Sequence, residues 1–452
     1  AHAGRDREGR ARSLRLSSPM VTQASLISDL QSIVGTDHAR APEDGRFVVD
    51  SMRPQVAVEP GSYEEVATVL RYASETSSAV IPWGGGTMMY IGNVPMRYDL
   101  ALDLGRLNRI IEHEPTDLTI TCQAGITVGR LQNTLSEFDQ MVPLSSSFDP
   151  LGTVGGVLAV NSWGPERHVF GSPRDYTIGM RVITADGRIT RAGGKVVKNV
   201  AGYDLCKLYI GSLGTLGVIV EATFKVQPLP KASTWMIVGC GTVEESCSMA
   251  REVDRKGLSV WSVAVEHYTW DALVKPYLLW LAVAGTHAGV ERTIREVTDL
   301  ASASGLESWE SPPRESLPLG KSWTKLHPEI ELKEVTGLEC KAMVAPEHTA
   351  DVMSALTSLG SELHLSILPT IGLVRAQWTQ TSPAEIETLL SGLSAVVGSY
   401  KGTATVLFGD PAMKRRIDVF GDPPPAFELM RRVKMQFDPN GILSPGRFVG
   451  RL

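Results

Sequence analysis

Three glycine-rich turns are the residues of this sequence best suited to bind a ligand. They span residues 84–87 (GGGT), 152–156 (GTVGG) and 211–217 (GSLGTLG). Glycine lets the main chain approach a ligand closely and adopt positive φ, so that several amide N–H groups can converge on one anion. A single turn of this kind is more often a plain tight turn. Three in succession predict one large ligand that carries phosphate.

Few side chains outside these turns are placed for acid–base chemistry. His364 alternates with apolar neighbours in a predicted strand, a setting in which a histidine packs more often than it acts as a base. Arg375 is open to two interpretations, a cation that holds a carboxylate in a cleft or an exposed strand residue. The pair Arg174-Asp175 is either an ion pair that braces a loop or a plain surface pair. The sequence identifies no catalytic base.

A βαβ unit precedes the first turn. The pattern predicts a strand over residues 55–58, a helix over 63–75 and a strand over 79–82, with Ser62 and Glu65 as a capping box. The dinucleotide fingerprint G-x-G-x-x-G is missing from the whole sequence, which disfavours a nicotinamide-binding Rossmann domain.

Alternating strands and helices predict a second α+β domain after residue 230. Its expected strands cover residues 235–238, 260–265, 278–284, 342–344, 364–368 and 373–378, and its helices cover 243–253, 290–303 and 348–359. The predicted organisation is a disordered tail (1–19), a first domain (20–230), the second domain (231–402) and a C-terminal segment (403–452) that packs back on the first domain.

Composition excludes several classes of protein. The 452 residues are 43% hydrophobic and 21% charged, as in a soluble globular enzyme, and a net charge of −6 gives no basic face for nucleic acid. Five cysteines without a C-x-x-C pair predict neither disulfides, nor zinc, nor an iron–sulfur cluster, and favour the cytoplasm. The longest apolar run, residues 277–284, is too short to cross a bilayer. Any membrane association is expected to be peripheral, at the inner face of the cell membrane and through a complex.

The turns and two further stretches resemble one flavoprotein family. The stretches are residues 150–161 (PLGTVGGVLAVN) and 437–447 (FDPNGILSPGR). Together they are similar to the FAD-binding PCMH-type family that includes vanillyl-alcohol oxidase, p-cresol methylhydroxylase and D-lactate dehydrogenase. Residues 193–205 (GGKVVKNVAGYDL) also resemble the FAD-binding subunit (E subunit) of bacterial glycolate oxidase.

This resemblance implies the fold and the cofactor. The fold is α+β, with an FAD-binding domain of two subdomains, an α+β cap domain for substrate or partner, and a returning C-terminal segment. The turns would surround the FAD pyrophosphate, while Ala159 and Asn161 would lie beside the flavin. The residues expected to bind FAD are Pro82, Trp83, Gly84, Gly85, Gly86, Thr87, Leu151, Gly152, Thr153, Gly155, Gly156, Ala159, Asn161, Ser172, Arg174, Asp175, Thr215, Gly217, Val218 and Ile219.

The resemblance also implies non-covalent FAD and no metal in this chain. In the histidyl-flavin members a histidine follows the first glycine turn, where this sequence has Thr87 and Met88. D-2-hydroxy-acid dehydrogenases of the family usually carry two metal-binding histidines in the second domain. The corresponding stretch, residues 364–375, has only His364.

The implied activity is oxidation of a 2-hydroxy acid, glycolate to glyoxylate, with electrons passed from the flavin to an external acceptor. Such chemistry needs a hydride acceptor, a base and cations that hold the carboxylate. The candidates for the last two roles are His364, Arg375 and Tyr203, of which Tyr203 lies near the third turn and either contacts flavin or packs. The expected partners are a small 2-hydroxy acid, a sister flavoprotein subunit and an iron–sulfur subunit.

Two other hypotheses stay open. The chain could be a non-catalytic FAD-bearing relay or assembly subunit of a metal-dependent D-2-hydroxy-acid dehydrogenase, which the missing histidine favours, or a stand-alone D-lactate-type dehydrogenase. A binding module without flavin is the third possibility.

Overall fold

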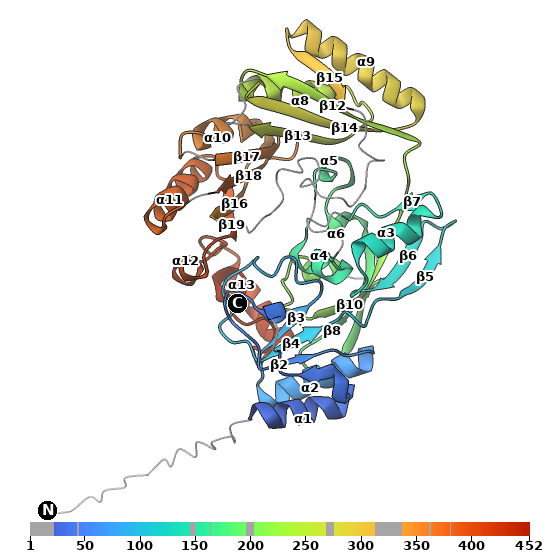
Figure 1. The fold of residues 1–452 in the computed structure, drawn as a ribbon, viewed down its shortest axis with the longest axis vertical. Helices are drawn as coiled ribbons and strands as arrows, with labels where there is room; N and C mark the ends of the chain where they lie inside the picture. The colour runs from blue at the N-terminus through green and yellow to red at the C-terminus, as the bar shows by residue number, and fades with distance from the viewer. Residues whose placement is uncertain are drawn as a thin grey trace, which may run out of the picture.

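The computed structural model describes residues 22–42, 45–144, 151–162, 164–195, 203–267, 275–311, 337–360, 363–379 and 381–452. Its helices and strands form two α+β domains that lie one above the other in Figure 1. The predicted tail over residues 1–19 lies outside the described residues. Within the described part of the chain, no helix is both long and apolar enough to cross a membrane.

The first domain begins with a four-stranded sheet of order β1-β2-β4-β3. β2 and β3 both run parallel to β4, as the predicted βαβ unit requires. The strands are β1 (Ala39–Arg40), β2 (Val56–Val58), β3 (Val80–Trp83) and β4 (Leu100–Asp103). They pack against α1 (Gln23–Val34) and α2 (Tyr63–Thr76). Ser62 caps α2 as predicted, but the Glu65 carboxylate accepts from Gly61 N at 2.7 Å rather than from the capping residue.

A five-stranded antiparallel sheet of order β5-β6-β10-β8-β9 forms the second half of this domain. Its buried face packs on α3 and α4, which follow from the apolar spacing of the sequence. The elements are β5 (Ile110–Glu114), β6 (Thr119–Gln123), β8 (Thr177–Ile183), β9 (Ile189–Gly193), β10 (Val218–Lys225), α3 (Val128–Ser136) and α4 (Val154–Val160). A short pair of strands, β7 (Gln140–Met141) and β11 (Gln227–Pro228), lies at its margin.

An eight-stranded sheet forms the second domain, with the order β15-β12-β14-β13-β17-β18-β16-β19. Its neighbouring strands pair antiparallel, and four helices cover one face (Figure 1). The strands are β12 (Ala232–Cys240), β13 (Val260–His267), β14 (Tyr277–Gly285), β15 (Glu307–Ser311), β16 (Leu338–Met343), β17 (Leu363–Leu368), β18 (Leu373–Trp378) and β19 (Thr403–Phe408). The helices are α8 (Val243–Arg255), α9 (His287–Ala303), α10 (Thr349–Leu356) and α11 (Pro383–Ser399). The other face turns toward the first domain.

β19 corrects one predicted boundary. Residues from 403 onward were expected in the C-terminal segment, but Thr403–Phe408 pairs with β16 along most of its length. Pairing satisfies the backbone groups of an edge strand, which explains why this segment stays with the second sheet. The chain returns to the first domain at α12 (Pro411–Arg416), where Lys414 Nζ pairs with Asp50 Oδ2 at 2.6 Å and donates to Tyr90 O at 2.9 Å.

The returning segment is fixed to the first domain by buried polar contacts. Lys434 of α13 (Phe427–Phe437) donates through Nζ to Thr215 O at 2.8 Å and pairs with Asp438 Oδ2 at 2.6 Å. Val80 N donates to Ile442 O at 2.8 Å, which extends the first sheet by one bridge. The C-terminal residues thereby reach the strand that leads into the first glycine turn.

Candidate functional site

The first two glycine turns lie directly against each other. A Cβ atom at Gly85 would stand 1.7 Å from Leu151 O, and one at Gly84 would stand 2.2 Å from Thr153 Oγ1. Such distances are far inside van der Waals contact, so only glycine fits at these positions. Turns from distant parts of the chain are therefore joined through their backbones.

The third turn completes this arrangement. Gly211 N and Leu213 N donate to Leu158 O and Ala159 O, both at 2.9 Å, at the end of α4. Gly214 adopts φ of +72° and would place a Cβ 3.1 Å from Pro82 Cγ. All three turns thus meet around one location, as predicted for one ligand.

Two small cavities, which we call the glycine cavities, lie between the turns. They measure about 70 and 50 Å³. The predicted FAD-binding residues that line them are Pro82, Trp83, Gly84, Gly85, Gly86, Thr87, Thr153, Gly155, Gly156, Ala159, Gly217, Val218 and Ile219. Six residues line both cavities, so the two form neighbouring parts of one elongated space: Pro82, Gly84, Thr153, Gly156, Ala159 and Gly214.

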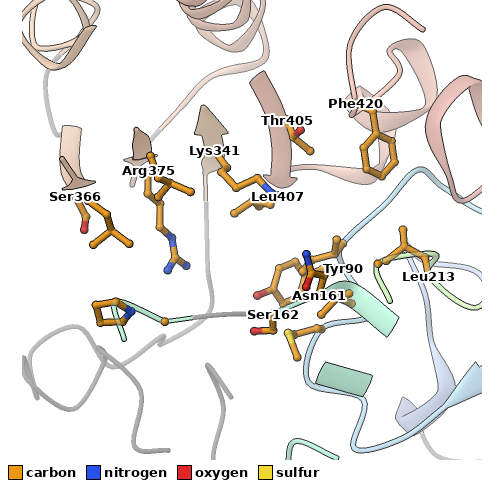
Figure 2. A pocket seen from close by; sticks show the side chains of 18 of the residues that line it. Tyr90, Asn161, Ser162, Leu213, Lys341, Ser366, Arg375, Thr405, Leu407 and Phe420 are labelled. Carbon is orange, nitrogen blue, oxygen red and sulfur yellow. The ribbon is translucent and has the colours of Figure 1, made fainter. Parts of the chain in front are cut away.

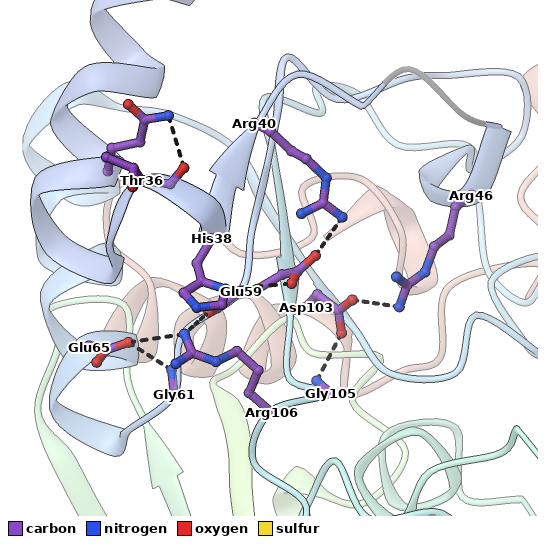
Figure 3. A network of polar contacts seen from close by, with 11 residues as sticks. Thr36, His38, Arg40, Arg46, Glu59, Gly61, Glu65, Asp103, Gly105 and Arg106 are labelled. Carbon is purple, nitrogen blue, oxygen red and sulfur yellow. Dashed lines mark hydrogen bonds and ion pairs between the residues drawn. The ribbon is translucent and has the colours of Figure 1, made fainter.

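A polar network holds the strand end beside the first turn (Figure 3). Asp103, which pairs in register with Trp83, accepts from Arg46 at 2.6 Å and from Gly105 N at 2.9 Å. Burial raises the pKa of Asp103, while the bond from Gly105 and the charge of Arg46 oppose that rise. The network fixes the end of β4 and so the starting point of the glycine turn.

Arg447 lines the larger glycine cavity although it is not among the residues predicted to bind FAD. Its side chain is 3% exposed. Nη2 donates to the carbonyl oxygens of Met89 and Ile91, whereas Nη1 is buried without a hydrogen-bond partner in the structure. Burial lowers the pKa of this guanidinium. A buried donor of this kind costs free energy unless a ligand accepts its bond, so an anionic group fits here.

A larger cavity of about 310 Å³ opens between the two domains. It shares Met88, Val160 and Leu213 with the larger glycine cavity, which makes the three cavities one continuous series. Asn161 ends α4 at φ of +52° and presents a buried Oδ1 without a hydrogen-bond partner in the structure. Figure 2 shows Asn161 opposite the strands of the second domain, across this space.

The second domain contributes polar side chains from four neighbouring strands to this cavity. They are Ser366 on β17, Arg375 on β18, Lys341 on β16 and Thr405 on β19. Ser366, Arg375, Lys341 and Thr405 occupy paired register positions, so their side chains share one face of the sheet. We call this row the polar wall (Figure 2).

Two cations of the polar wall differ in their electrostatic setting. Arg375 Nε pairs with the buried Glu339 carboxylate, and Figure 2 shows its guanidinium extending away from the sheet. That carboxylate more than offsets burial, so the pKa of Arg375 is raised. Burial, followed by the charge of Arg167, lowers the pKa of Lys341. The wall can hold an anion through one fixed cation and one titratable cation.

The structure corrects one interpretation of the pair Arg174-Asp175. Arg174 and Asp175 do not pair with each other. Arg174 lines the large cavity and donates to Ile210 O at 2.7 Å, while Asp175 Oδ2 accepts from Ser172 N at 2.7 Å and from Ser172 Oγ at 2.9 Å in a capping box. The bond from Ser172 N satisfies a backbone donor at the start of the helix, which outweighs an exposed ion pair.

Four other expected FAD residues lie near the turns without lining the three cavities. Leu151 offers its carbonyl to the first turn but exposes its side chain, Gly152 O accepts from Val128 N, and Thr215 bonds Ser212 O. Ser172 is engaged with Asp175.

The weak candidates for a base occupy different places. Tyr203 is 96% exposed and does not line any of the three cavities, so the structure does not support it as a base there. His364 is half-buried and does not line the large cavity, and its Nε2 lies 2.9 Å from Glu266 Oε2. Lys198 and most of the glycolate-oxidase-like run lie outside the described residues. No group of three or more His, Cys, Asp or Glu side chains is arranged for a metal in the described part of the chain.

Comparisons with known proteins agree with this geometry. Residues 54–193 match a family of FAD binding domains, and residues 388–448 match the C-terminal domain of FAD linked oxidases. The chain is 27% identical to a D-lactate dehydrogenase of Archaeoglobus fulgidus, over 88% of this chain and 92% of the relative. It is 25% identical to glycolate oxidase subunit GlcD of Bacillus subtilis, over 88% of this chain and 89% of the relative.

Solved structures share the fold. p-Cresol methylhydroxylase with substrate bound superposes with a TM-score of 0.71 at 16% identity, over 94% of this chain and 96% of that one. An alkyldihydroxyacetonephosphate synthase superposes with a TM-score of 0.72 at 18% identity, over 93% and 84%. The chain therefore carries an FAD binding domain over residues 54–193 and a match to the C-terminal domain of FAD linked oxidases over residues 388–448, in a fold that it shares with p-cresol methylhydroxylase.

Proposed function

We propose that this chain is the FAD-binding subunit of a glycolate oxidase-type complex, in which it oxidises a small 2-hydroxy acid to the 2-oxo acid. The observation that carries the proposal is the polar wall, which places Arg375 and Lys341 in a cavity continuous with the glycine cavities. A relative that is named a D-lactate dehydrogenase and another named a glycolate oxidase subunit support this substrate class.

Three features of the site fit FAD. The glycine turns offer backbone amides for the pyrophosphate, Arg447 offers an unpartnered buried donor, and Asn161 offers an unpartnered amide oxygen. Thr87 and Met88 line the turn, and no histidine is among the described residues that line the three cavities. We therefore propose non-covalent FAD. Flavin colour that stays with the acid-precipitated protein would contradict this.

The wall residues would bind and orient the substrate. Arg375 offers a planar guanidinium suited to a carboxylate, and Lys341 offers a second cation from the adjacent strand. Leu368, Leu373 and Phe420 line the same cavity and would limit access of water to the bound acid. FAD, when bound, supplies the acceptor for the hydride from the substrate Cα.

Anaerobic addition of glycolate or D-lactate to the purified holoprotein tests the proposal. Bleaching of the flavin absorbance by either acid is the expected result. Reduced flavin must then pass its electrons to an acceptor outside this chain, for which we propose an iron–sulfur subunit of the complex. We place the chain in the cytoplasm or peripherally at the inner membrane face.

A second candidate function is an FAD-bearing relay or assembly subunit beside a metal-dependent sister chain. The single histidine of β17 favours it, since the described strands bring no histidine pair to the polar wall. Bleaching only after a sister flavoprotein subunit is added would support this alternative. Failure of FAD to copurify would contradict both.

A further inference from the structure

A buried series of side chains lies directly beside the polar wall, on the same face of the sheet. Ser366 lines the large cavity, and its Oγ donates to Glu266 Oε1 at 2.6 Å. The second oxygen, Glu266 Oε2, lies 2.9 Å from His364 Nε2. The Glu266 side chain is 2% exposed, so its carboxylate is reached from the cavity through the serine hydroxyl.

The sheet register explains why these three groups meet. Glu266 on β13 stands directly opposite Ser366 on β17, and His364 precedes Ser366 by two positions on the same face. Arg375 on β18 stands opposite Ser366 on its other side, and its charge and that of Glu266 attract each other. On β14 the residue opposite Glu266 is the apolar Leu278.

Burying a carboxylate beside a single hydroxyl and a histidine is costly unless the arrangement is satisfied or used. Glu339 provides a comparison within the same sheet, because it is equally buried but pairs with a guanidinium. Glu266 instead bonds a hydroxyl that faces the cavity. A hydroxyl in this position can accept a proton from a ligand while it passes its own proton to the carboxylate.

We propose that Glu266 is the proton acceptor of the reaction and acts through Ser366, with His364 as a positioning residue. This inference rests on the proposed function. The substrate hydroxyl O–H bond breaks, its proton moves to Ser366 Oγ, and the serine proton moves to Glu266 Oε1. The electron pair left on oxygen forms the C=O bond as the Cα–H bond breaks, and that hydrogen leaves with two electrons to the FAD. The products are the 2-oxo acid, two-electron-reduced FAD and protonated Glu266.

The test measures anaerobic flavin reduction by glycolate and D-lactate in the holoprotein with rapid mixing. Glu266→Gln and Ser366→Ala are expected to lower the limiting rate about 100-fold or more, with little change in the substrate concentration at half-saturation. Glu266→Asp should recover part of the rate because it keeps the carboxylate. His364→Gln should have a smaller effect on the same limiting rate.

Two matched variants separate this role from a structural one. Glu339→Gln removes an equally buried carboxylate and should raise the half-saturating concentration through Arg375, while the limiting rate changes less. Ser246→Ala removes a buried hydroxyl of the same domain that bonds Val243 O and lines none of the three cavities, so it should not reproduce the rate loss of Ser366→Ala. FAD content and melting temperature are measured for each variant, and those that fold and hold FAD are compared.

Three outcomes would overturn the inference. If the Glu266→Gln and Ser366→Ala variants reduce their flavin at the wild-type limiting rate, proton transfer through Ser366 to Glu266 is excluded, while the proposed function stands. Loss of the limiting rate in Lys341→Met, with Glu266→Gln unaffected, would make the lysine the base. If no 2-hydroxy acid reduces the flavin of the wild-type protein, even with partner subunits, both the proton transfer to Glu266 and the proposed function are excluded.

Discussion

The glycine cavities and the polar wall meet in one site but are built in different ways. The glycine cavities consist of backbone from three turns that touch each other, as the close approach of Gly85 to Leu151 O shows. The polar wall consists of side chains that four antiparallel strands bring into register. The glycine cavities depend on the absence of side chains, whereas the polar wall depends on the identity of each of its side chains.

Under the proposed function, this difference separates cofactor binding in the glycine cavities from substrate binding at the polar wall. A backbone cavity tolerates no added atoms but does not discriminate among ligands that share a pyrophosphate. A wall of cations and hydroxyls can change its substrate by a single replacement while the fold persists. Substitutions in the glycine cavities should therefore reduce FAD binding, whereas substitutions in the polar wall should weaken substrate binding.

The largest effect is expected for Gly85→Ala. Its Cβ would overlap the carbonyl of Leu151, so the turns must separate, at a cost of about 1–3 kcal/mol in folding free energy and with loss of most bound FAD. Gly194→Ala is the control, because a Cβ there meets nothing within 4 Å. Flavin absorbance per protein and thermal melting measure both. Full FAD content in Gly85→Ala would show that the turns do not need this contact.

The next effect is expected for Arg447→Gln. Loss of a charge-assisted bond of about 1.5–3 kcal/mol should weaken FAD binding by about 10- to 100-fold. Titration of the apoprotein with FAD, followed by quenching of flavin fluorescence, measures the change.

Arg97→Gln is the control for Arg447, since Arg97 is an exposed arginine of the same domain. An equal loss of affinity for ADP would place the Arg447 bond on the phosphates, whereas a loss for FAD alone would place it on the flavin. Unchanged affinity for both would exclude Arg447 from the cofactor site.

Arg375→Gln tests the polar wall. We expect the half-saturating concentration of the 2-hydroxy acid to rise about 10-fold or more, while FAD content stays close to wild type because the wall does not line the glycine cavities. Steady-state kinetics and flavin absorbance provide the two measurements. Arg416→Gln, at an exposed ion pair with Glu387, is the control. A loss of FAD in Arg375→Gln would contradict the separation of the two regions.

The smallest effect is expected from pH. Burial and the charge of Arg167 lower the pKa of Lys341, so this lysine loses its proton at a lower pH than a free lysine does. Substrate affinity should accordingly fall as the pH rises toward the alkaline range, because the carboxylate stays charged while the cation is lost. The half-saturating concentration is measured against pH. Lys341→Arg, which stays protonated, should flatten that profile; an unchanged slope would show that Lys341 does not bind the acid.

The sequence predicted elements of both domains, and the six strands and three helices expected after residue 230 all overlap elements of the second sheet and its helices. Glycine positions, capping residues and apolar spacing are local signals, so the βαβ unit, the three turns and their meeting point followed directly from them. The strand over residues 403–408 was misplaced because an edge strand is assigned by its partner, β16, and not by its own residues. Of the two interpretations of Arg174-Asp175, the ion pair is wrong for a similar reason, since each side chain has a nearer backbone or hydroxyl partner.

The sequence by itself predicted one large ligand that carries phosphate, because a backbone cavity requires glycine at fixed places and those places are visible in the order of residues. The resemblance of the same stretches to a flavoprotein family made that ligand FAD. Only the tertiary structure decided which side chains lie in or beside the large cavity. Lys341, Ser366 and Glu266 carry no local signal, and they meet through the register of strands that are far apart in the chain. Arg447 likewise carries no local signal, since it lines the larger glycine cavity only when the C-terminal segment packs beside the first turn. Register and packing depend on the whole sheet and core, and single residues cannot show them.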